Sequence, residues 1–186
     1  MPARTTRLLV LGTVRRLGPA SGYEVQSHLF GLAADRWAGL RSGSIYAMLR
    51  SLTRAALIAV APEDPGRYVT TEAGRHAHDS LTLGALRSLP DTGDTTELRA
   101  ALEFADMLPP DAVRHALIER LAAIDGALGD ITARVRAGSA HGSPFVTRGT
   151  GLQYALLRAQ EGWLRALLDV LAGSRAVDPP PQVGGS

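Results

Sequence analysis

The segment from Arg41 to Ile58 (RSGSIYAMLRSLTRAALI) constrains the fold most, because its apolar and polar residues separate at the period of an α-helix. One stripe is apolar and suited to burial: Ile45, Met48, Leu49, Leu52 and Ala56. The opposite stripe carries an aromatic residue and two arginines: Tyr46, Ala47, Arg50, Ser51 and Arg54. The pattern fits a helix that reads a DNA groove, and it equally fits an ordinary amphipathic helix with a solvated basic face.

The start of this helix favours contact with an anion. Ser42 is a candidate N-cap, and Gly43 has no side chain to keep a partner away from the backbone. Free amide groups in the first turn of a helix attract phosphate oxygens. We therefore expect the beginning of the helix to lie near a phosphate.

Composition indicates a mainly helical protein and excludes several kinds of chemistry. The chain has 186 residues, of which 45% are hydrophobic and only 5% aromatic, and Ala, Leu and Arg are abundant. It has no lysine and no cysteine, so it has no Schiff-base or P-loop lysine, no thiolate nucleophile, no disulfide and no Cys-ligated zinc. We expect neither enzymatic activity, nor a metal, nor a cofactor.

Positive charge is concentrated in the N-terminal part. Residues 1–80 carry ten arginines and six acidic side chains, a formal charge of +4, whereas residues 81–186 carry ten arginines and twelve acidic side chains, a charge of −2. A moderate positive field suits a polyanionic partner, although proteins that bind no polyanion often carry such a charge. The early apolar run, Leu8 to Val14, is too short for a membrane span and lacks a cleavage site, so we expect a cytoplasmic protein.

Two further short helices precede this segment, and a hairpin follows it. A first helix is predicted over residues 6–17, and a second begins at Ser21, which has capping-box spacing with Glu24. Residues 57–61 and 67–70 are predicted strands around a turn at 62–66, and Thr71 can cap a fourth helix that reaches about residue 89. Three helices, a hairpin and a linking helix are the order of a winged helix-turn-helix domain.

The C-terminal part is predicted to be helical. The boundary is expected at residues 90–95 (PDTGDT), followed by a helix in which Asp94 and Glu97 have capping-box spacing. A long helix then carries a heptad seam, and a loop at 138–144 leads to a last helix with an apolar side at Leu152, Leu156, Ala159, Trp163, Leu167 and Val170. The expected domains are residues 1–89 for DNA binding, 96–172 for helical dimerisation, and a disordered tail at 173–186.

Two segments carry a resemblance to a known family. GSIYAMLRSLTRAALI (43–58) and RYVTTEAGR (67–75) resemble the PadR family of bacterial transcriptional regulators, and Gly22-Tyr23-Glu24 and Trp37 fit its second helix and the aromatic residue before the recognition helix. A weaker similarity covers residues 104–110 and Trp163-Leu164. The resemblance implies a winged-helix domain, a C-terminal helical dimerisation domain and operator binding as a homodimer.

The chain departs from the family pattern at two places. Ala47 stands where the family often has proline, and since alanine favours helix this change is harmless. The hairpin is shorter than in many relatives and places Glu63 and Asp64 beside a single arginine, Arg67. More of the DNA affinity would therefore come from the recognition helix and from Arg4 and Arg7.

The candidate site residues fall into two groups. The DNA-contact candidates are Arg4, Arg7, Arg41, Ser42, Gly43, Ser44, Tyr46, Arg50, Arg54 and Arg67. The dimerisation candidates are Leu117, Leu121, Ile124, Leu128, Ile131, Val135, Leu156, Trp163 and Leu167. Trp163 either packs in the seam or stacks on a flat apolar effector. His76 and His78 point in different directions on one helix and cannot share a metal ion.

We expect a sequence-specific transcriptional regulator, a ligand-responsive repressor that binds an inverted-repeat DNA operator as a homodimer. The alternative is a winged-helix module that binds another protein and no DNA. The residues leave open the effector and whether one exists, the operator sequence, repression against activation, and contact between the acidic hairpin and DNA.

Overall fold

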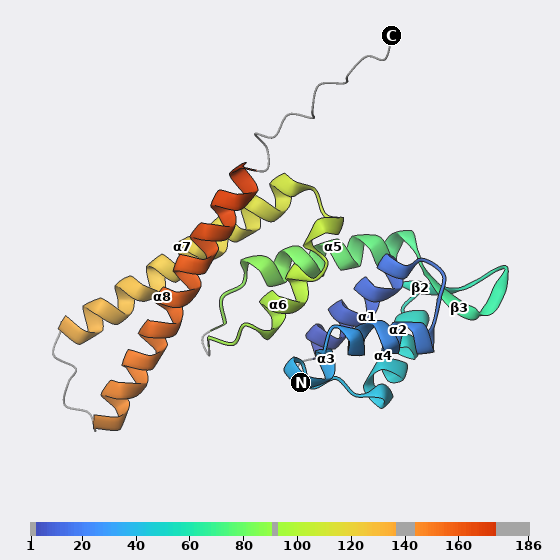
Figure 1. Cartoon of the computed structure of the whole chain (residues 1–186), viewed down its shortest axis with the longest axis horizontal. Helices are drawn as coiled ribbons and strands as arrows, with labels where there is room; N and C mark the ends of the chain where they lie inside the picture. Colours follow the sequence, from blue (N-terminus) through green and yellow to red (C-terminus); the bar gives the residue numbers. More distant parts are fainter. Residues whose placement is uncertain (1–2, 91–92, 137–143, 174–186) are drawn as a thin grey trace, which may run out of the picture. The chain divides into compact units, whose positions relative to one another are not determined.

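The computed structural model describes residues 3–90, 93–136 and 144–173. Of the described residues, 3–88 and 94–113 form one compact unit, and 89–90, 93, 114–136 and 144–173 form the other. Figure 1 shows the elements of both units. The predicted loop at 138–144 and the predicted tail at 173–186 lie outside the described residues, apart from Pro144 and Gly173.

The first unit is a winged helix-turn-helix, which confirms the predicted fold class. Its helices and strands, in chain order, are α1 (Ala3–Leu17), β1 (Ala20–Ser21), α2 (Gly22–Gly31), α3 (Ala34–Trp37), α4 (Ser42–Arg54), β2 (Ile58–Ala61), β3 (Asp64–Thr70), α5 (Glu72–Arg87), α6 (Thr96–Leu102) and the 3₁₀ turn η1 (Ala105–Met107). The capping box of Ser21 and Glu24 is present as predicted.

Helix α1 is the centre of this unit. It packs against α2, α4, α5 and α6, and its residues from Leu8 to Val14 are buried on all sides. This burial explains why its sequence shows a continuous apolar run instead of a stripe. From α4, Ile45, Leu49 and Leu52 are buried, as the amphipathic pattern predicted. Met48 is only half-buried, and Ala56, which the prediction placed on the same stripe, is exposed because the helix ends at Arg54.

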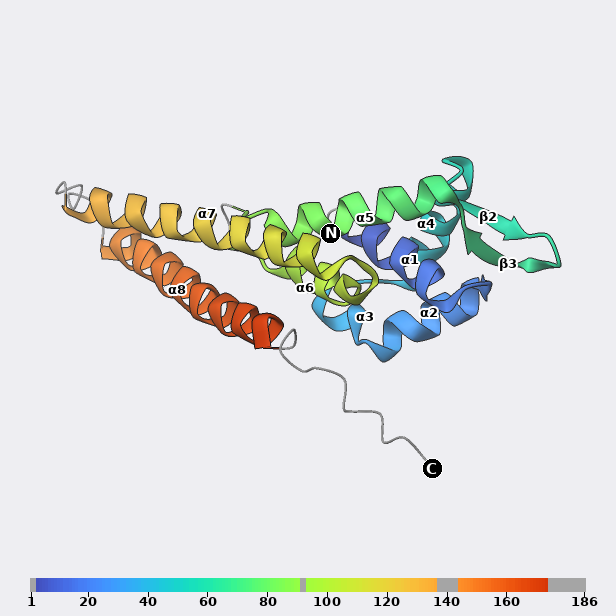
Figure 2. The ribbon, with the colours of Figure 1, turned by 90° about the horizontal axis from the view of Figure 1, so that it is seen from above.

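The wing is a three-stranded antiparallel sheet in the order β1-β3-β2. Tyr68 of β3 pairs with Val60 of β2 on one side and with Ala20 of β1 on the other. Strand β3 begins at Asp64, three residues before its predicted start, and neither the two-residue strand β1 nor the four-residue helix α3 was foreseen. Figure 2 shows the β2–β3 hairpin extending beyond the helices of its unit.

The junction between the hairpin and α5 depends on glycine. Thr71 caps α5 by accepting a hydrogen bond from the Gly74 amide at 3.0 Å and donates one to the carbonyl of Ala56 at 2.8 Å. A Cβ at position 74 would lie 1.9 Å from the carbonyl oxygen of Leu57, so only glycine fits there.

Helix α6 packs on α1 and α5, with Leu98, Ala101 and Phe104 buried. Through this packing, residues 94–113 belong to the first compact unit, while the functional limits at residues 89 and 96 stay a prediction. The predicted capping box is absent: Asp94 accepts hydrogen bonds from both the amide and the hydroxyl of Thr96, at 2.8 and 2.6 Å. Glu97 lies 3.8 Å from Arg4 instead.

The second unit is a helical hairpin of α7 (Pro110–Arg136) and α8 (Pro144–Gly173), which lie side by side in both views (Figures 1 and 2). The two helices are joined by a hydrogen bond of 3.1 Å from Arg120 to Gln160 and an ion pair of 3.6 Å between Arg165 and Asp125. No helix in the described part of the chain is long and apolar enough to cross a membrane.

Candidate nucleic-acid interface

Helix α4 presents its polar edge to solvent. Ser42, Gly43, Tyr46, Arg50 and Arg54 are all exposed, while the opposite side of the helix is buried in the unit. The fold therefore brings together, on one helix edge, five of the ten candidate DNA contacts.

The first turn of α4 is built differently from the prediction. The N-cap is Arg41, and Ser42 is the first residue inside the helix. The hydroxyl of Ser44 accepts from the Arg41 amide at 3.1 Å and donates to the Arg41 carbonyl at 2.6 Å. The hydroxyl that bonds the backbone at the start of the helix is therefore that of Ser44, three residues after the N-cap, and Ser42 is not the N-cap. The amides of Ser42 and Gly43 precede the first intrahelical hydrogen bonds, as an anion site requires.

Tyr46 lies against the start of α2. A Cβ at Gly22 would come within 2.6 Å of Cε1 of the Tyr46 ring, so the ring occupies space that only a glycine leaves open. The side chain of Tyr46 is nevertheless 38% exposed. One edge of the Tyr46 ring is therefore packed against α2, and the other faces solvent.

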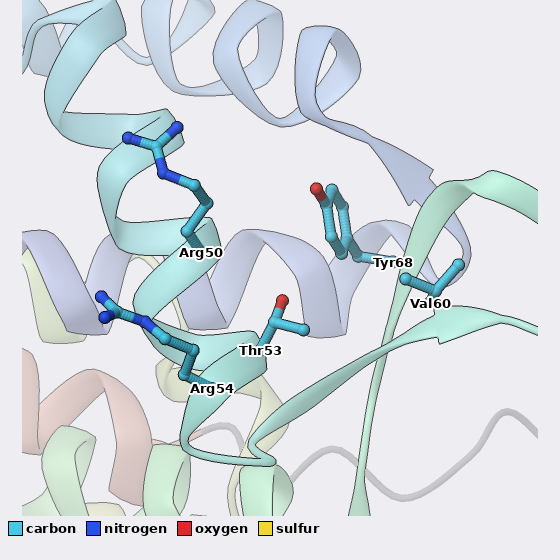
Figure 3. A pocket seen from close by; sticks show the side chains of 5 residues that line it. All are labelled: Arg50, Thr53, Arg54, Val60 and Tyr68. Carbon is cyan, nitrogen blue, oxygen red and sulfur yellow. The ribbon is translucent and has the colours of Figure 1, made fainter.

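A groove of ≈ 510 Å³ lies between α4 and the wing (Figure 3). It is lined by Arg50, Thr53, Arg54, Val60 and Tyr68. Figure 3 shows Arg50 and Arg54 one above the other on α4, with Tyr68 and Val60 across from them on the strands. Within the described residues neither arginine forms an ion pair.

Sequence reasoning missed Thr53, Val60 and Tyr68 as parts of this surface. Tyr68 was noted only as part of a motif. The sequence could have indicated Val60 and Tyr68 through the register of the predicted hairpin. They are cross-strand partners, and partners lie on the same face of a sheet.

Arg67, the single basic residue of the wing, is held by its neighbours. Its guanidinium donates to Glu24 Oε1 at 3.0 Å and to the Pro19 carbonyl at 2.8 Å, and it lies 3.2 Å from Asp64. Hydrogen bonds from Ser21, followed by the charge of Arg67, lower the pKa of Glu24. Two carboxylates thus offset the Arg67 charge, and its contact with DNA stays a prediction.

Arg4, Arg7 and Arg41 lie at separate places. The Arg4 guanidinium contacts the backbone near Gly84 of α5 and pairs with Glu97, so the fold directs it toward α5 and α6. Arg7 is half-buried on α1, and Arg41 is exposed at the start of α4. Of the three, only Arg41 lies next to the exposed edge of α4.

A buried cluster stands behind this surface. His78 is fully buried and accepts a hydrogen bond at Nδ1 from Arg15 at 3.0 Å, while Arg15 also pairs with Asp79. Because an arginine only donates, His78 must be neutral, with its proton on Nε2 toward Thr82. Burial, followed by the charge of Arg15, lowers the pKa of His78 to about 4. His76 is exposed and pairs with Glu72, so the two histidines face different surroundings.

In the helical hairpin, the candidate dimerisation residues divide between the inside and the outside. Leu117, Ile124, Leu128 and Ile131 of α7 are buried, Leu121 is half-buried and Val135 is exposed. On α8 the buried residues are Leu157, Glu161 and Leu164, whereas Leu152, Leu156, Trp163 and Val170 are exposed. The α7 seam therefore packs mostly within one chain. Most of the apolar side predicted for α8 faces solvent, and Leu167 on that side is half-buried.

Comparisons with known proteins return structures only: no family model and no curated protein matches the sequence. PadR from Bacillus subtilis is similar, with 20% identity, 92% of this chain and 97% of that chain covered, and a TM-score of 0.40. A PadR-like transcriptional regulator from Bacillus cereus has 16% identity, coverages of 91% and 99%, and a TM-score of 0.39. A third structure, PadR in complex with operator DNA, has 19% identity, coverages of 89% and 98%, and a TM-score of 0.35. These neighbours are PadR or PadR-like regulators.

Proposed function

We propose that this protein is a sequence-specific DNA-binding transcriptional regulator of the PadR type. The observation that carries the proposal is the exposed edge of α4 in a winged helix-turn-helix, which combines an open first turn with Tyr46 and two arginines that have no acidic partner in the described residues. In such domains the N-terminal residues of the recognition helix contact base edges in the major groove. Ser42, Gly43 and Tyr46 occupy that position.

The charge distribution supports a polyanion as partner. Arg15, Arg16 and Arg67 are paired with Asp79, Asp106 and Glu24, whereas Arg50 and Arg54 are exposed without such pairs in the part of the chain that the structure describes. An unpaired arginine at a surface contributes its full charge to a field that attracts phosphate.

We further propose that the protein acts as a homodimer, with DNA binding by residues 1–89 and dimerisation within residues 96–172. In this second segment α7 and α8 supply the contact surface, and residues 96–113 belong to the first unit. Leu156 and Trp163 are each 46% exposed on α8, and Leu152 and Val170 are more exposed still. A two-fold dimer places two recognition helices on successive half-sites of an inverted repeat, separated by about 34 Å or a multiple of this distance.

The regulatory part of the proposal is a repressor that responds to an effector. Trp163 supplies a flat, partly exposed indole on the stripe where two copies would meet, and such a surface can stack on a flat apolar molecule. An effector bound there would act by changing the arrangement of the two DNA-binding units.

A second candidate function, binding to another protein, has one observation in its favour. Tyr23 is 72% exposed and lines, with Leu17 and His28, a depression of ≈ 340 Å³ beside α2. Exposed aromatic residues beside a depression are frequent at protein interfaces.

Selection of bound sequences from a random DNA pool tests the proposal, followed by fluorescence anisotropy with the selected duplex at 50 and 200 mM salt. We expect enriched inverted repeats, affinity that falls steeply with salt, and weaker binding by Arg50→Ala. Arg114→Ala, which removes an exposed arginine of α7, is the matched control and should bind normally. Absence of binding at 50 mM salt would reject a DNA-binding function and favour the protein-binding alternative.

A further inference from the structure

The groove between α4 and the wing has two chemically different walls. Arg50 and Arg54 form a cationic wall on the helix, and Val60 and Tyr68 form an apolar wall with one hydroxyl on the strands (Figure 3). A sugar–phosphate chain has the matching composition, because anionic phosphates alternate with deoxyribose rings whose C–H groups pack on apolar surface.

We propose that this groove seats the backbone of one DNA strand, so that Arg50 and Arg54 bind phosphates instead of base edges and Tyr68 is an additional DNA contact. The inference rests on the proposed DNA-binding function. It specifies which part of the surface contacts bases and which part contacts the DNA backbone.

Both arginines lie well beyond the first turn of α4. At 1.5 Å per residue, Arg50 lies about 12 Å and Arg54 about 18 Å along the helix axis from Ser42. The major groove is about 12 Å wide. With the first turn of α4 at the base edges, Arg50 and Arg54 lie more than two and more than three helical turns further along α4, so they are the residues of this helix edge farthest from those base contacts.

The positively charged side chains that could bind phosphates in this groove come from α4. Thr53, at the floor of the groove, uses its hydroxyl proton in a 3.0 Å hydrogen bond to the Leu49 carbonyl. Arg67 of the wing is already engaged with Glu24 and Asp64. Arg50 and Arg54 are the cations of the groove lining, and neither has an acidic partner within the described residues.

The strand wall offers packing and one donor. Val60 is 46% exposed, which is high for a strand valine, and Tyr68 beside it is half-buried. The Tyr68 hydroxyl has no hydrogen-bond partner among the residues that the structure describes, and Figure 3 shows it directed across the groove toward α4. A half-buried tyrosine hydroxyl usually finds a partner, and a phosphate oxygen would supply one.

A small molecule fits this groove less well than a strand. Binding sites for small molecules bury most of the ligand surface. Arg50, Thr53, Arg54 and Val60 are all exposed, so the groove is open along its length. An open channel with cationic and apolar walls suits an extended chain.

The test measures affinity for a selected duplex and for a scrambled duplex of equal length, at 50, 100 and 200 mM salt. Arg50→Ala and Arg54→Ala should each weaken binding to both duplexes by the same factor and reduce the slope of log K against log salt by about 0.9 per protomer, which is about 1.8 for the proposed homodimer. Tyr68→Phe should weaken binding to both duplexes by a few-fold with an unchanged slope, because a neutral hydroxyl releases no counterion. Arg114→Ala and Tyr154→Phe on the second unit are the matched controls and should leave affinity and slope unchanged.

Three results would overturn the inference while the proposed function stands. In the first, the wild-type protein prefers the selected duplex, but either arginine variant loses that preference while the slope of log K against log salt stays unchanged. This is the result expected of an arginine that contacts base edges. Alternatively, Tyr68→Phe would bind both duplexes as tightly as the wild type. A control variant that weakened DNA binding as much as the groove variants would also contradict binding of the DNA backbone in this groove. If the wild-type protein bound neither duplex, the proposed function itself would fail.

Discussion

The ring of Tyr46 lies where a side chain at Gly22 would otherwise be. The Cβ of an alanine at position 22 would be 2.6 Å from Cε1 of that ring, closer than carbon atoms approach in proteins. Gly22 is the first residue of α2, and Tyr46 lies on the exposed edge of α4. The two helices of the helix-turn-helix therefore meet through a glycine that determines the orientation of a candidate DNA-contact residue.

We predict that Gly22→Ala weakens DNA binding by displacing the Tyr46 ring. The expected loss in anisotropy titrations is about tenfold, whereas the melting temperature should change little because the ring is partly exposed and can turn outward. A double-mutant cycle gives the decisive measurement, since residues in contact show non-additive effects. If Gly22 acts through Tyr46, adding Gly22→Ala to Tyr46→Ala causes no further loss. Additive losses would show that position 22 acts independently.

Gly43→Ala should separate folding stability from DNA binding. A Cβ at position 43 meets nothing within 4 Å, so alanine should raise the free energy of unfolding by up to about 1 kcal/mol. The same methyl group would keep the DNA away from the backbone of the first turn and weaken binding. Gly126→Ala on α7, which also has open space, should add stability and leave DNA affinity unchanged. Full DNA affinity in Gly43→Ala would argue against close backbone approach at this position.

Buried His78 should make folding pH-dependent. Its pKa falls from 6.5 to about 4 in the folded protein, so the unfolded chain binds the proton more tightly. Stability from this residue is present above pH 6.5 and is lost as the pH falls toward 4. Denaturant titrations should show a loss of about 2 kcal/mol between pH 7.5 and pH 5 from this group alone.

His78→Gln tests this origin because glutamine can still accept from Arg15 but does not titrate in this range. The variant should lose most of the pH dependence between pH 7.5 and pH 5. His76→Gln, which removes an exposed histidine from the same helix, should keep it. An unchanged pH profile in His78→Gln would mean that other groups carry the effect.

The exposed stripe on α8 predicts how self-association can be disrupted. Trp163→Glu should raise the dimer dissociation constant at least tenfold in sedimentation equilibrium, because each two-fold interface would contain the lost contact twice. The melting temperature of the hairpin should stay close to that of the wild type, since Trp163 is 46% exposed. Ala122→Glu adds the same charge to the exposed side of α7 and should not affect association. Equal dissociation constants for both variants would place the interface elsewhere.

The packing of α6 predicts where the first unit can be cut. A fragment that ends at residue 113 should unfold cooperatively, whereas one that ends at residue 93 loses the cover supplied by Leu98 and Phe104. Loss of such large buried side chains typically costs several kcal/mol each. Thermal unfolding followed by circular dichroism measures the difference, and equal stabilities would support the original limit near residue 89.

The sequence predicted the elements that carry strong periodicity and missed those that do not. The apolar stripe of α4, the capping box of Ser21 and the cap of α5 by Thr71 all rest on local chemistry, and the structure contains each of them. Helix α3 has four residues and β1 has two, which is too short for any period to appear.

Other features depend on contacts that no local pattern encodes. Apolar residues of α8 occur in adjacent pairs, so periodicity could not tell that Leu157 and Leu164 are buried while Leu156 and Trp163 are exposed. Similarly, the position of α6 follows from Phe104 fitting beside Gly12, a pair separated by almost half the chain. The groove that holds Arg50 and Tyr68 also required the hairpin to be folded against α4.

The ion pairs of Arg67 have a consequence for how binding strength can change during evolution. The wing contains a positive charge that two carboxylates, Glu24 and Asp64, currently offset. Loss of the Asp64 charge alone would leave the capping box of Ser21 and Glu24 at α2 intact. The positive charge of Arg67 would then be offset by one carboxylate instead of two. Overall affinity for DNA could thus be raised by one substitution outside α4, without any change to the residues that choose the sequence.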